Sequence, residues 1–393
     1  MSVLEGVRVL DLGRYIAGPF CAALLADYGA DVIRVDRVGG SEDRFILPVS
    51  DTGDGAQFLQ VNRNKRSISL EIDTPEGRRV LEELIRRSDV VIANMPPRTL
   101  EKLGLDYESL RRLKADIILT ASTAFGTEPH VRDRVAFDGV GQAISGSVHL
   151  SGSPDQPAKA MVPTVDIATA LSCALGTMMA LFERKNSGLG QEVGASLLQT
   201  ALNISSSSLI EEAVLKVNRQ ATMNRAAQYA PSDIFKAKDG WFITQVIGQG
   251  MFKRWANMIG QPELLDDPRF QDDLQRGEHG VFLSGLMSAW SQNKTRSEAL
   301  EALERARIPA GPVNSPKEVL EDEVILSTNP FEYMQYPGVE QAIPVVKAPI
   351  FLSRTPGQIT RRPPLPGEHT DEILQELGMT DEAVAQLRAD AVI

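Results

Sequence analysis

Cysteine and histidine are scarce in this sequence. Its 393 residues contain two cysteines, Cys21 and Cys173, and four histidines, His130, His149, His279 and His369. Two cysteines so far apart in the sequence cannot supply a disulfide framework or a cysteine metal cage. The histidines show neither helical pairing nor metal-ligand spacing. We therefore expect no bound metal, two buried thiols, and histidines that are structural or on the surface.

Positive charge and long apolar runs are also lacking. There are 41 basic and 52 acidic residues, a net charge of −11, which argues against a nucleic acid or an anionic membrane as partner. No stretch has 18 uninterrupted apolar residues, and the first residues show no basic region followed by an apolar one. With 42% hydrophobic residues, the expectation is a cytoplasmic globular protein long enough for two domains.

The first 122 residues alternate between strand and helix patterns. Apolar strands are predicted at 7–12, 31–36, 67–72, 88–94 and 117–122, with helices at 20–28, after Thr74-Pro75, and from Thr99 to Lys114 with a break near Gly104. This order predicts a doubly wound α/β domain whose parallel strands present their carboxyl ends to a ligand. The segment Gly13–Pro19 lacks the Gly-x-Gly-x-x-Gly spacing, which argues against NAD.

A cluster of basic residues lies directly before the third strand. It is Asn62-Arg63-Asn64-Lys65-Arg66. Such residues at the end of a sheet can bind phosphate, and they can equally form a solvated basic turn. Both interpretations stay open at this point.

The longest apolar helix predicted in the chain carries a single acidic residue near its start. The pattern runs from Met161 to Phe182 and ends at Lys185–Gly188, and Asp166 lies near its head. Asp166 is interpreted either as an N-cap or as a nucleophile, because the helix N-terminus favours the ionised carboxylate.

The pattern changes in the second half of the chain. A long helix is predicted at 195–216, and short elements follow from Asn224 to Asn329, including a strand at 240–244, the segment Gly248-Gln249-Gly250 and a helix at 251–259. Near the C-terminus a proline-rich arm at 363–366 precedes a short helix capped by Thr370. We read the middle part as a second, smaller domain.

Six of these segments together resemble one family, the class III CoA-transferases, over nearly the whole length. They are Gly6–Leu12 with Ala17-Gly18-Pro19, Gly29–Ile33, Asn64–Ser67, Asp166 in its apolar context, Ile308–Val313 and Gly367–Thr370. The resemblance implies an α/β fold, with a Rossmann-like parallel-sheet large domain and a smaller α+β domain, in an interlocked homodimer. The large CoA-binding domain would begin with 1–200, followed by a linker helix at 201–223, the small domain at 224–329, and a returning segment at 330–393.

The resemblance also assigns roles to individual residues. Asp166 matches the catalytic aspartate, and a CoA thioester would be a substrate rather than a permanently bound cofactor. The implied CoA-binding positions are Ile16, Ala17, Arg37, Leu70, Ile72, Asn94, Met95, Lys102 and Asp138. Gly248 and Gly250, and the loop at Ile16-Ala17, are candidates to stabilise an oxyanion, although the glycines also fit an ordinary turn. Arg34 is expected inside its strand.

Two positions depart from named branches of the family. Ile16 stands where formyl-CoA transferase has a glutamine, and Phe137 stands where the racemase branch has its histidine base. Asp138, which follows Phe137, is expected either to orient or repel a group at the site or to have a structural role at the end of a strand. The leading interpretation is a CoA-transferase that acts on an acyl-CoA and a carboxylic acid. The alternatives are an acyl-CoA racemase or isomerase of the same fold, and a non-catalytic CoA-binding protein.

Overall fold

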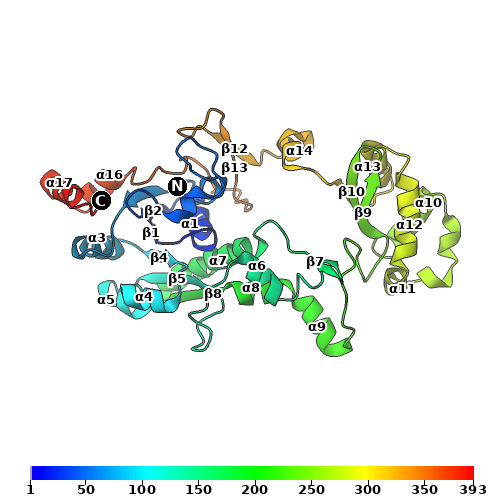
Figure 1. The fold of residues 1–393 in the computed structure, drawn as a ribbon, viewed down its shortest axis with the longest axis horizontal. Helices are drawn as coiled ribbons and strands as arrows, with labels where there is room; N and C mark the ends of the chain where they lie inside the picture. The colour runs from blue at the N-terminus through cyan, green and yellow to red at the C-terminus, as the bar shows by residue number, and fades with distance from the viewer. Residues whose placement is uncertain (1) are drawn as a thin grey trace. The chain divides into compact units, whose positions relative to one another are not determined.

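The chain folds into two compact units, which are described separately. The computed structural model describes residues 2–393. The first, here called the sheet unit, comprises the chain up to Ser145, Ala160–Leu209 and Pro330–Ile393, and the second, the inserted unit, comprises Gly146–Lys159 and Ile210–Asn329 (Figure 1). The segment 201–223, predicted as a linker helix, is divided between the two units, and Gly146–Lys159 belongs to the inserted unit.

A six-stranded sheet forms the centre of the sheet unit. Its order is β3-β2-β1-β4-β5-β8, and all neighbouring strands are parallel. The strands are β1 (Arg8–Asp11), β2 (Asp31–Asp36), β3 (Arg66–Ser69), β4 (Val90–Ala93), β5 (Ile118–Thr123) and β8 (Glu192–Ser196). The doubly wound α/β prediction is confirmed, but β8 was missed: its residues were read partly as the start of a helix. The sequence Glu-Val-Gly-Ala-Ser has little strand propensity, and β8 is an edge strand specified by its pairing with β5.

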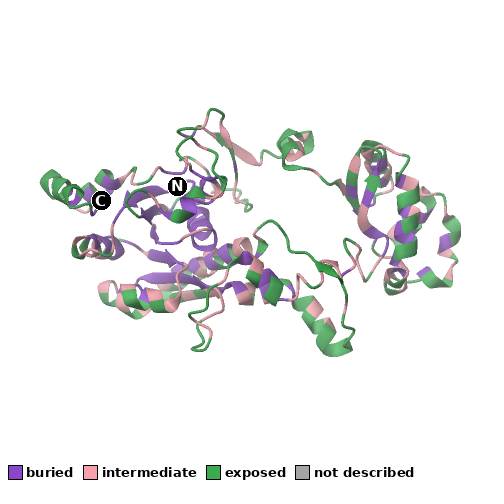
Figure 2. Cartoon of the chain, in the orientation of Figure 1, coloured by how far each residue is buried: buried purple, intermediate pink, exposed green. Residues whose placement is uncertain are grey.

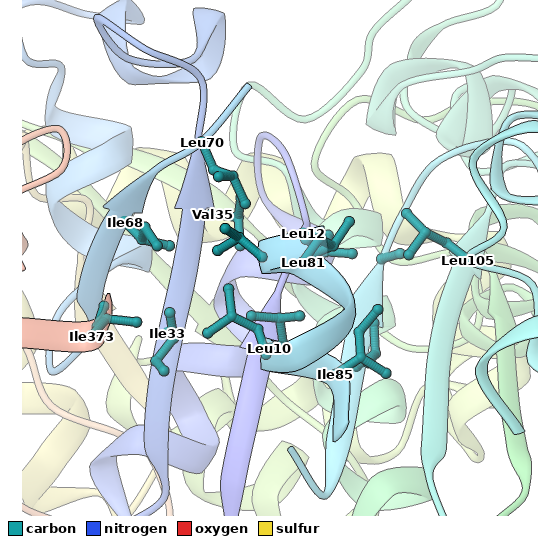
Figure 3. Packing of buried hydrophobic residues seen from close by; sticks show 14 of the residues in the cluster. Leu10, Leu12, Ile33, Val35, Ile68, Leu70, Leu81, Ile85, Leu105 and Ile373 are labelled. Carbon is teal, nitrogen blue, oxygen red and sulfur yellow. The ribbon is translucent and has the colours of Figure 1, made fainter. Parts of the chain in front are cut away.

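Helices cover both faces of this sheet. One face packs on α1 (Ala17–Asp27) and α7 (Thr164–Ser187), and the other on α3 (Pro75–Arg86), α4 (Pro97–Leu103) and α5 (Tyr107–Leu113). Side chains alternate along each strand, so Val9 and Val32 join the first layer. Leu10 and Ile33 join the second layer, which Figure 3 shows. The predicted cap of α3 is confirmed, since the Thr74 side chain accepts a hydrogen bond from the Gly77 N–H. Figure 2 shows the sheet as the most buried part of this unit.

The C-terminal segment completes the sheet unit through α16 (Thr370–Glu376) and α17 (Asp381–Ala389). Ile373 of α16 is fully buried in the same layer as Leu10 and Ile33 (Figure 3). The predicted capping role of Thr370 is wrong, because His369 precedes the helix and Thr370 is its first residue. The Thr370 hydroxyl instead accepts a hydrogen bond from the Ser69 N–H, 3.1 Å away, at the end of β3.

The inserted unit has its own sheet and core. Strands β9 (Ser232–Ala237), β10 (Gly240–Gln245) and β11 (Ala310–Pro312) form an antiparallel sheet in the order β11-β10-β9. Its main helices are α10 (Gln249–Met258), α11 (Asp273–Glu278), α12 (Gly280–Ser291) and α13 (Arg296–Arg305). They enclose a core rich in aromatic side chains, including Phe252 and Trp255. The α+β character predicted for this part is confirmed.

The remaining elements are short. They are α2 (Ala56–Val61), α6 (Asp138–Ile144), β6 (Gly152–Ser153), β7 (Gln156–Pro157), α8 (Leu197–Ile204), α9 (Ser206–Leu215), α14 (Pro316–Glu321), α15 (Glu323–Ser327), β12 (Phe331–Met334) and β13 (Ile343–Val346). The single helix predicted at 195–216 is therefore wrong: the chain forms β8, α8 and α9, with a break at Ser205.

Helix α7 is long and apolar enough to cross a membrane by length and composition alone, and 39% of its most apolar window is buried. In this structure it packs against α1 and the sheet. Its end is as predicted, with Gly188 in the left-handed conformation. Cys21 and Cys173, from α1 and α7, are both free and buried, as expected.

Candidate active site

Asp166 is the third residue of α7. The N-cap interpretation is wrong, because Pro163 occupies that position and no side chain of its own caps the helix. Within residues 2–393, neither a hydrogen bond nor an ion pair reaches the Asp166 carboxylate. Asp166 is therefore partly buried without a partner for its charge.

The cap of α7 comes from a different helix. Asp138, the first residue of α6, is buried, and its Oδ2 accepts hydrogen bonds from the N–H groups of Val165 (2.7 Å) and Asp166 (3.1 Å). Its Oδ1 accepts from the side-chain amide of Gln142, one turn along α6. Asp138 was predicted among the CoA contacts, and in the structure both of its oxygens are occupied within the protein.

These surroundings change the acidity of Asp166. Burial, and second the negative charge of Asp138, raise the pKa of Asp166 to about 6. The favourable field expected from the helix N-terminus is thus outweighed. At neutral pH the carboxylate is still ionised and is poorly stabilised by its surroundings, which suits a nucleophile.

The loop between β1 and α1 is held rigidly by side chains. Asp11 Oδ1 accepts from the Gly13 N–H (2.8 Å), and Asn94 binds both the N–H (2.8 Å) and the carbonyl (2.7 Å) of Arg14. The Tyr15 N–H donates to Asp43 (3.0 Å), and Tyr15 adopts φ 64°, in the left-handed region. Asn94, predicted as a CoA contact, therefore fixes this loop.

The loop also reaches the Asp138 side of the site. The rings of Tyr15 and Phe137 lie edge to face with centroids 5.4 Å apart, and Phe137 immediately precedes Asp138. The predicted site residues Ile16 and Ala17 are both buried at the start of α1. The first N–H groups of a helix have no acceptor within that helix, so this end can donate hydrogen bonds to a negatively charged atom.

Five of the predicted CoA-binding residues line one cleft of about 350 Å³ at the carboxyl ends of β2, β3 and β4. They are Arg37, Leu70, Ile72, Met95 and Lys102. Leu70 is buried, whereas Arg37 and Lys102 are exposed at the rim. The cleft thus combines apolar walls with exposed basic side chains at its rim, a combination suited to a nucleotide with phosphates.

The comparison with known proteins decides the family. A family model described as CoA-transferase family III matches residues 4–370. The chain is 34% identical, over 394 residues, to a succinyl-CoA–D-citramalate CoA-transferase from Chloroflexus aurantiacus, with 99% of this chain and 98% of the relative covered. A succinate–glutarate CoA-transferase from Agrobacterium fabrum is 33% identical, with 95% of each chain covered. The chain belongs to CoA-transferase family III.

A solved structure agrees with this assignment. A CAIB/BAIF family protein from Brucella suis matches with a TM-score of 0.84 at 31% identity, covering 96% of this chain and 99% of that one. As a member of CoA-transferase family III, the protein is an enzyme that transfers CoA between an acyl-CoA and a carboxylic acid.

The basic cluster before β3 matches neither interpretation made from the sequence. The side chains of Arg63 and Lys65 are completely buried, with Arg63 2.6 Å from Asp27 and Lys65 2.7 Å from Asp11. Arg66 is bound to Asp31 at 2.7 Å. These cations are therefore neither solvated nor available to phosphate. As expected, Arg34 is buried within β2.

The two candidate glycines lie in the inserted unit at the start of α10. Gly248 has φ 78° and precedes the helix, and its N–H already donates to the Asp273 carboxylate (2.9 Å). Gly250 lies in the first turn of α10 rather than in a loop. Any role for Gly248 as an oxyanion donor would first require its bond to Asp273 to open.

Proposed function

We propose that this family III enzyme moves CoA from an acyl-CoA thioester to a carboxylic acid, with Asp166 as the covalent nucleophile. The observation that carries the proposal is the state of Asp166, a partly buried carboxylate at a helix head that is ionised at neutral pH. Among the residues that the structure describes, none supplies it with a cation or a hydrogen-bond donor. A structural aspartate in such a place would be expected to have a partner.

The proposed transfer needs no reagent beyond the acyl-CoA and the acceptor acid. An Asp166 oxygen attacks the thioester carbonyl and expels CoA thiolate, which leaves a mixed anhydride. The thiolate then attacks the aspartyl carbonyl and expels the donor acid as a carboxylate, which gives an aspartyl-CoA thioester. The acceptor carboxylate attacks this thioester, and the released thiolate attacks the acceptor carbonyl of the second anhydride. The new acyl-CoA leaves and Asp166 is regenerated.

The residues around Asp166 support these steps in distinct ways. The N–H groups that begin α1, at Ala17 and Gly18, would stabilise the oxyanions, and their loop is held rigidly in advance of the reaction. Arg37 and Lys102 would bind the CoA phosphates, while Leu70, Ile72 and Met95 contact the adenine. Phe137 cannot act as a base, which disfavours racemisation.

We also propose that the enzyme works in the cytoplasm as an interlocked homodimer. One face of α7 supports an association, since Leu175, Met179 and Phe182 are 58%, 61% and 71% exposed at helical spacing. Two copies of the chain could cover these faces mutually. Light scattering on the purified protein should give the mass of two chains, and the mass of one chain would contradict the proposed dimer.

Covalent trapping tests the mechanism. The protein would be incubated with succinyl-CoA, the donor named for a relative, and with acetyl-CoA, then treated with hydroxylamine or borohydride and mapped by mass spectrometry. We expect modification at Asp166 only, and none in Asp166→Ala. An unmodified Asp166 in the presence of bound CoA donors would contradict the mechanism. Uptake of deuterium at the α-carbon of the acyl group would then indicate an isomerase.

A further inference from the structure

We infer that Asp138 is a positioning residue for the transfer reaction, which keeps the Asp166 carboxylate free by occupying the backbone donors that this carboxylate would otherwise bind. The inference rests on the proposed role of Asp166. It assigns to Asp138 a function other than contact with CoA.

The first four N–H groups of α7 all have acceptors other than the Asp166 side chain. The Thr164 N–H donates to the Val162 carbonyl (2.9 Å), and the next two N–H groups, of Val165 and Asp166, donate to Asp138. The Ile167 N–H donates to the Pro163 carbonyl (3.0 Å), which begins the regular helical pattern. No backbone donor of the first turn remains for the side chain of Asp166.

The identity of residue 163 removes the last local donor. A carboxylate at the third position of a helix commonly reaches back to the N–H of the N-cap residue. Here the N-cap is Pro163, which has no N–H. Asp166 thus lies at a position where acidic side chains usually cap the helix, but here Asp138 of the neighbouring helix α6 provides the cap.

Asp138 itself is fixed by a second residue, Gln142. The Gln142 side-chain amide donates to Asp138 Oδ1, and its oxygen accepts from the Ala160 N–H (2.9 Å). Gln142 is buried. Through these two hydrogen bonds it connects α6 to the segment that leads into α7. Gly141 allows this close approach of the helices, since a Cβ at position 141 would lie 3.1 Å from Val165 Cγ1.

The charge of Asp138 acts in the same direction as its hydrogen bonds. After burial, the negative charge of Asp138 is the second cause of the raised pKa of the Asp166 carboxylate. Like charges repel, so the ionised Asp166 is disfavoured relative to the neutral anhydride or thioester that it forms. The pair therefore favours reaction at Asp166 without contacting the substrate through Asp138.

The test compares Asp138→Ala and Asp138→Asn with the wild type in steady-state kinetics over pH 4.5–8. In Asp138→Ala the N–H groups of Val165 and Asp166 become free to bind the Asp166 carboxylate. We expect kcat to fall about 30- to 100-fold, as for a misplaced reacting group, with KM for acyl-CoA changed less than about threefold. The acidic limb of the profile should move to lower pH in both variants, because the repelling charge is lost.

A matched control separates positioning from stability. Asp106 caps α5 in the same unit by accepting the Ser109 N–H (3.0 Å). Asp106→Ala also removes a helix cap, and it should lower the melting temperature without moving kcat or the acidic limb. Gln142→Leu should reproduce the Asp138 effects in weaker form, and it keeps the test valid if Asp138→Ala does not fold.

Two results would overturn the inference. One is a raised KM for acyl-CoA with kcat and the pH profile unchanged, which would make Asp138 a CoA contact. The other is trapping of Asp166 at the wild-type rate in folded Asp138→Ala. Failure of the proposed function is recognised separately, since wild-type Asp166 would then not be trapped at all.

Discussion

Two aspartates of the sheet unit show how differently the same side chain behaves when it is buried. Asp36, at the end of β2, is completely buried and contacts Arg34 at 2.9 Å and Arg44 at 3.2 Å. Burial acts to raise the pKa of Asp36, but the two guanidinium groups outweigh it and hold this pKa well below its usual range. In the described part of the chain, residues 2–393, no cation pairs with Asp166, and burial together with the charge of Asp138 raises its pKa to about 6. The paired carboxylate holds the fold together, and the unpaired one is available for chemistry.

The largest expected effect is on catalysis at the unpaired carboxylate. Asp166→Asn should lower the transfer rate by about 10⁴-fold or more, because the proposed nucleophile is lost. The melting temperature should be unchanged or higher, since the ionised group is unfavourable in the folded state. Coupled CoA-transfer assays and thermal unfolding of the same samples provide the measurements. A clear drop in melting temperature would show that Asp166 is a structural residue like Asp36.

The opposite result is expected at the paired carboxylate. Asp36→Asn leaves Arg34 and Arg44 buried beside a neutral group. The free energy of unfolding, measured in urea, should therefore be about 3–5 kcal/mol lower than in the wild type. Catalytic activity per folded molecule should change far less than in the Asp166 variant. Glu340→Gln, at an exposed position, is the control and should leave the urea midpoint unchanged. An Asp36 variant of wild-type stability would mean that the ion pairs do not stabilise the fold.

The two aspartates should also respond to pH with opposite signs. Protonated Asp166 cannot attack a thioester, so kcat/KM should fall about tenfold per pH unit below pH 6. The raised pKa means that the contribution of Asp166 to stability is present at low pH and lost as the pH rises through about 6. The pKa of Asp36 is lowered in the folded state, so Asp36 stabilises the fold at every pH above the pKa that it has in the unfolded chain. This contribution is lost at strongly acidic pH. Activity profiles from about pH 4 to 8, together with urea titrations extended down to about pH 2, would reveal both trends.

A smaller effect is expected at the rim of the cleft that is lined by Arg37 and Lys102, the proposed CoA site. Lys102 is exposed, so Lys102→Ala should cost about 1 kcal/mol of binding, or roughly a fivefold increase in KM for acyl-CoA. The increase should shrink at high salt, which screens exposed charges, and kcat should stay the same. Lys114→Ala, whose side chain pairs with Asp116 away from the cleft, is the control. Equal KM values for both variants would place the CoA phosphates elsewhere.

Local patterns made much of the fold predictable. The strands at 31–36 and 117–122, the Thr74 cap and the glycine end of α7 each depend on neighbours within a few residues, and all were found close to where the sequence indicates. The resemblance added the cleft residues, five of which the structure brings together. Edge strand β8 was missed because its pairing with β5, about 70 residues earlier, is what makes it a strand.

The pairing of charges could not be read from the sequence in the same way. Lys65 is 54 residues from Asp11, and Arg63 is 36 from Asp27, so the basic cluster looked exposed. Asp138 is 27 and 28 residues from the N–H groups that it binds, and no local signal connects them. Asp43, which holds the Tyr15 N–H, was not predicted for the same reason. In each case the decisive partner is brought near only by the folded chain.

The return of α16 to β3 has a consequence for how the protein is made. The Ser67 carbonyl and the Ser69 N–H of β3 bind His369 and Thr370, about 300 residues later in the chain. All six strands of the large sheet and the whole inserted unit are therefore translated before the helix that covers this edge. During this interval Ile33 and Ile68 lack the covering that Ile373 provides, and an exposed apolar edge is a binding site for chaperones or for other nascent chains. Translation of the segment that contains α16 thus ends the period in which this edge is prone to aggregation.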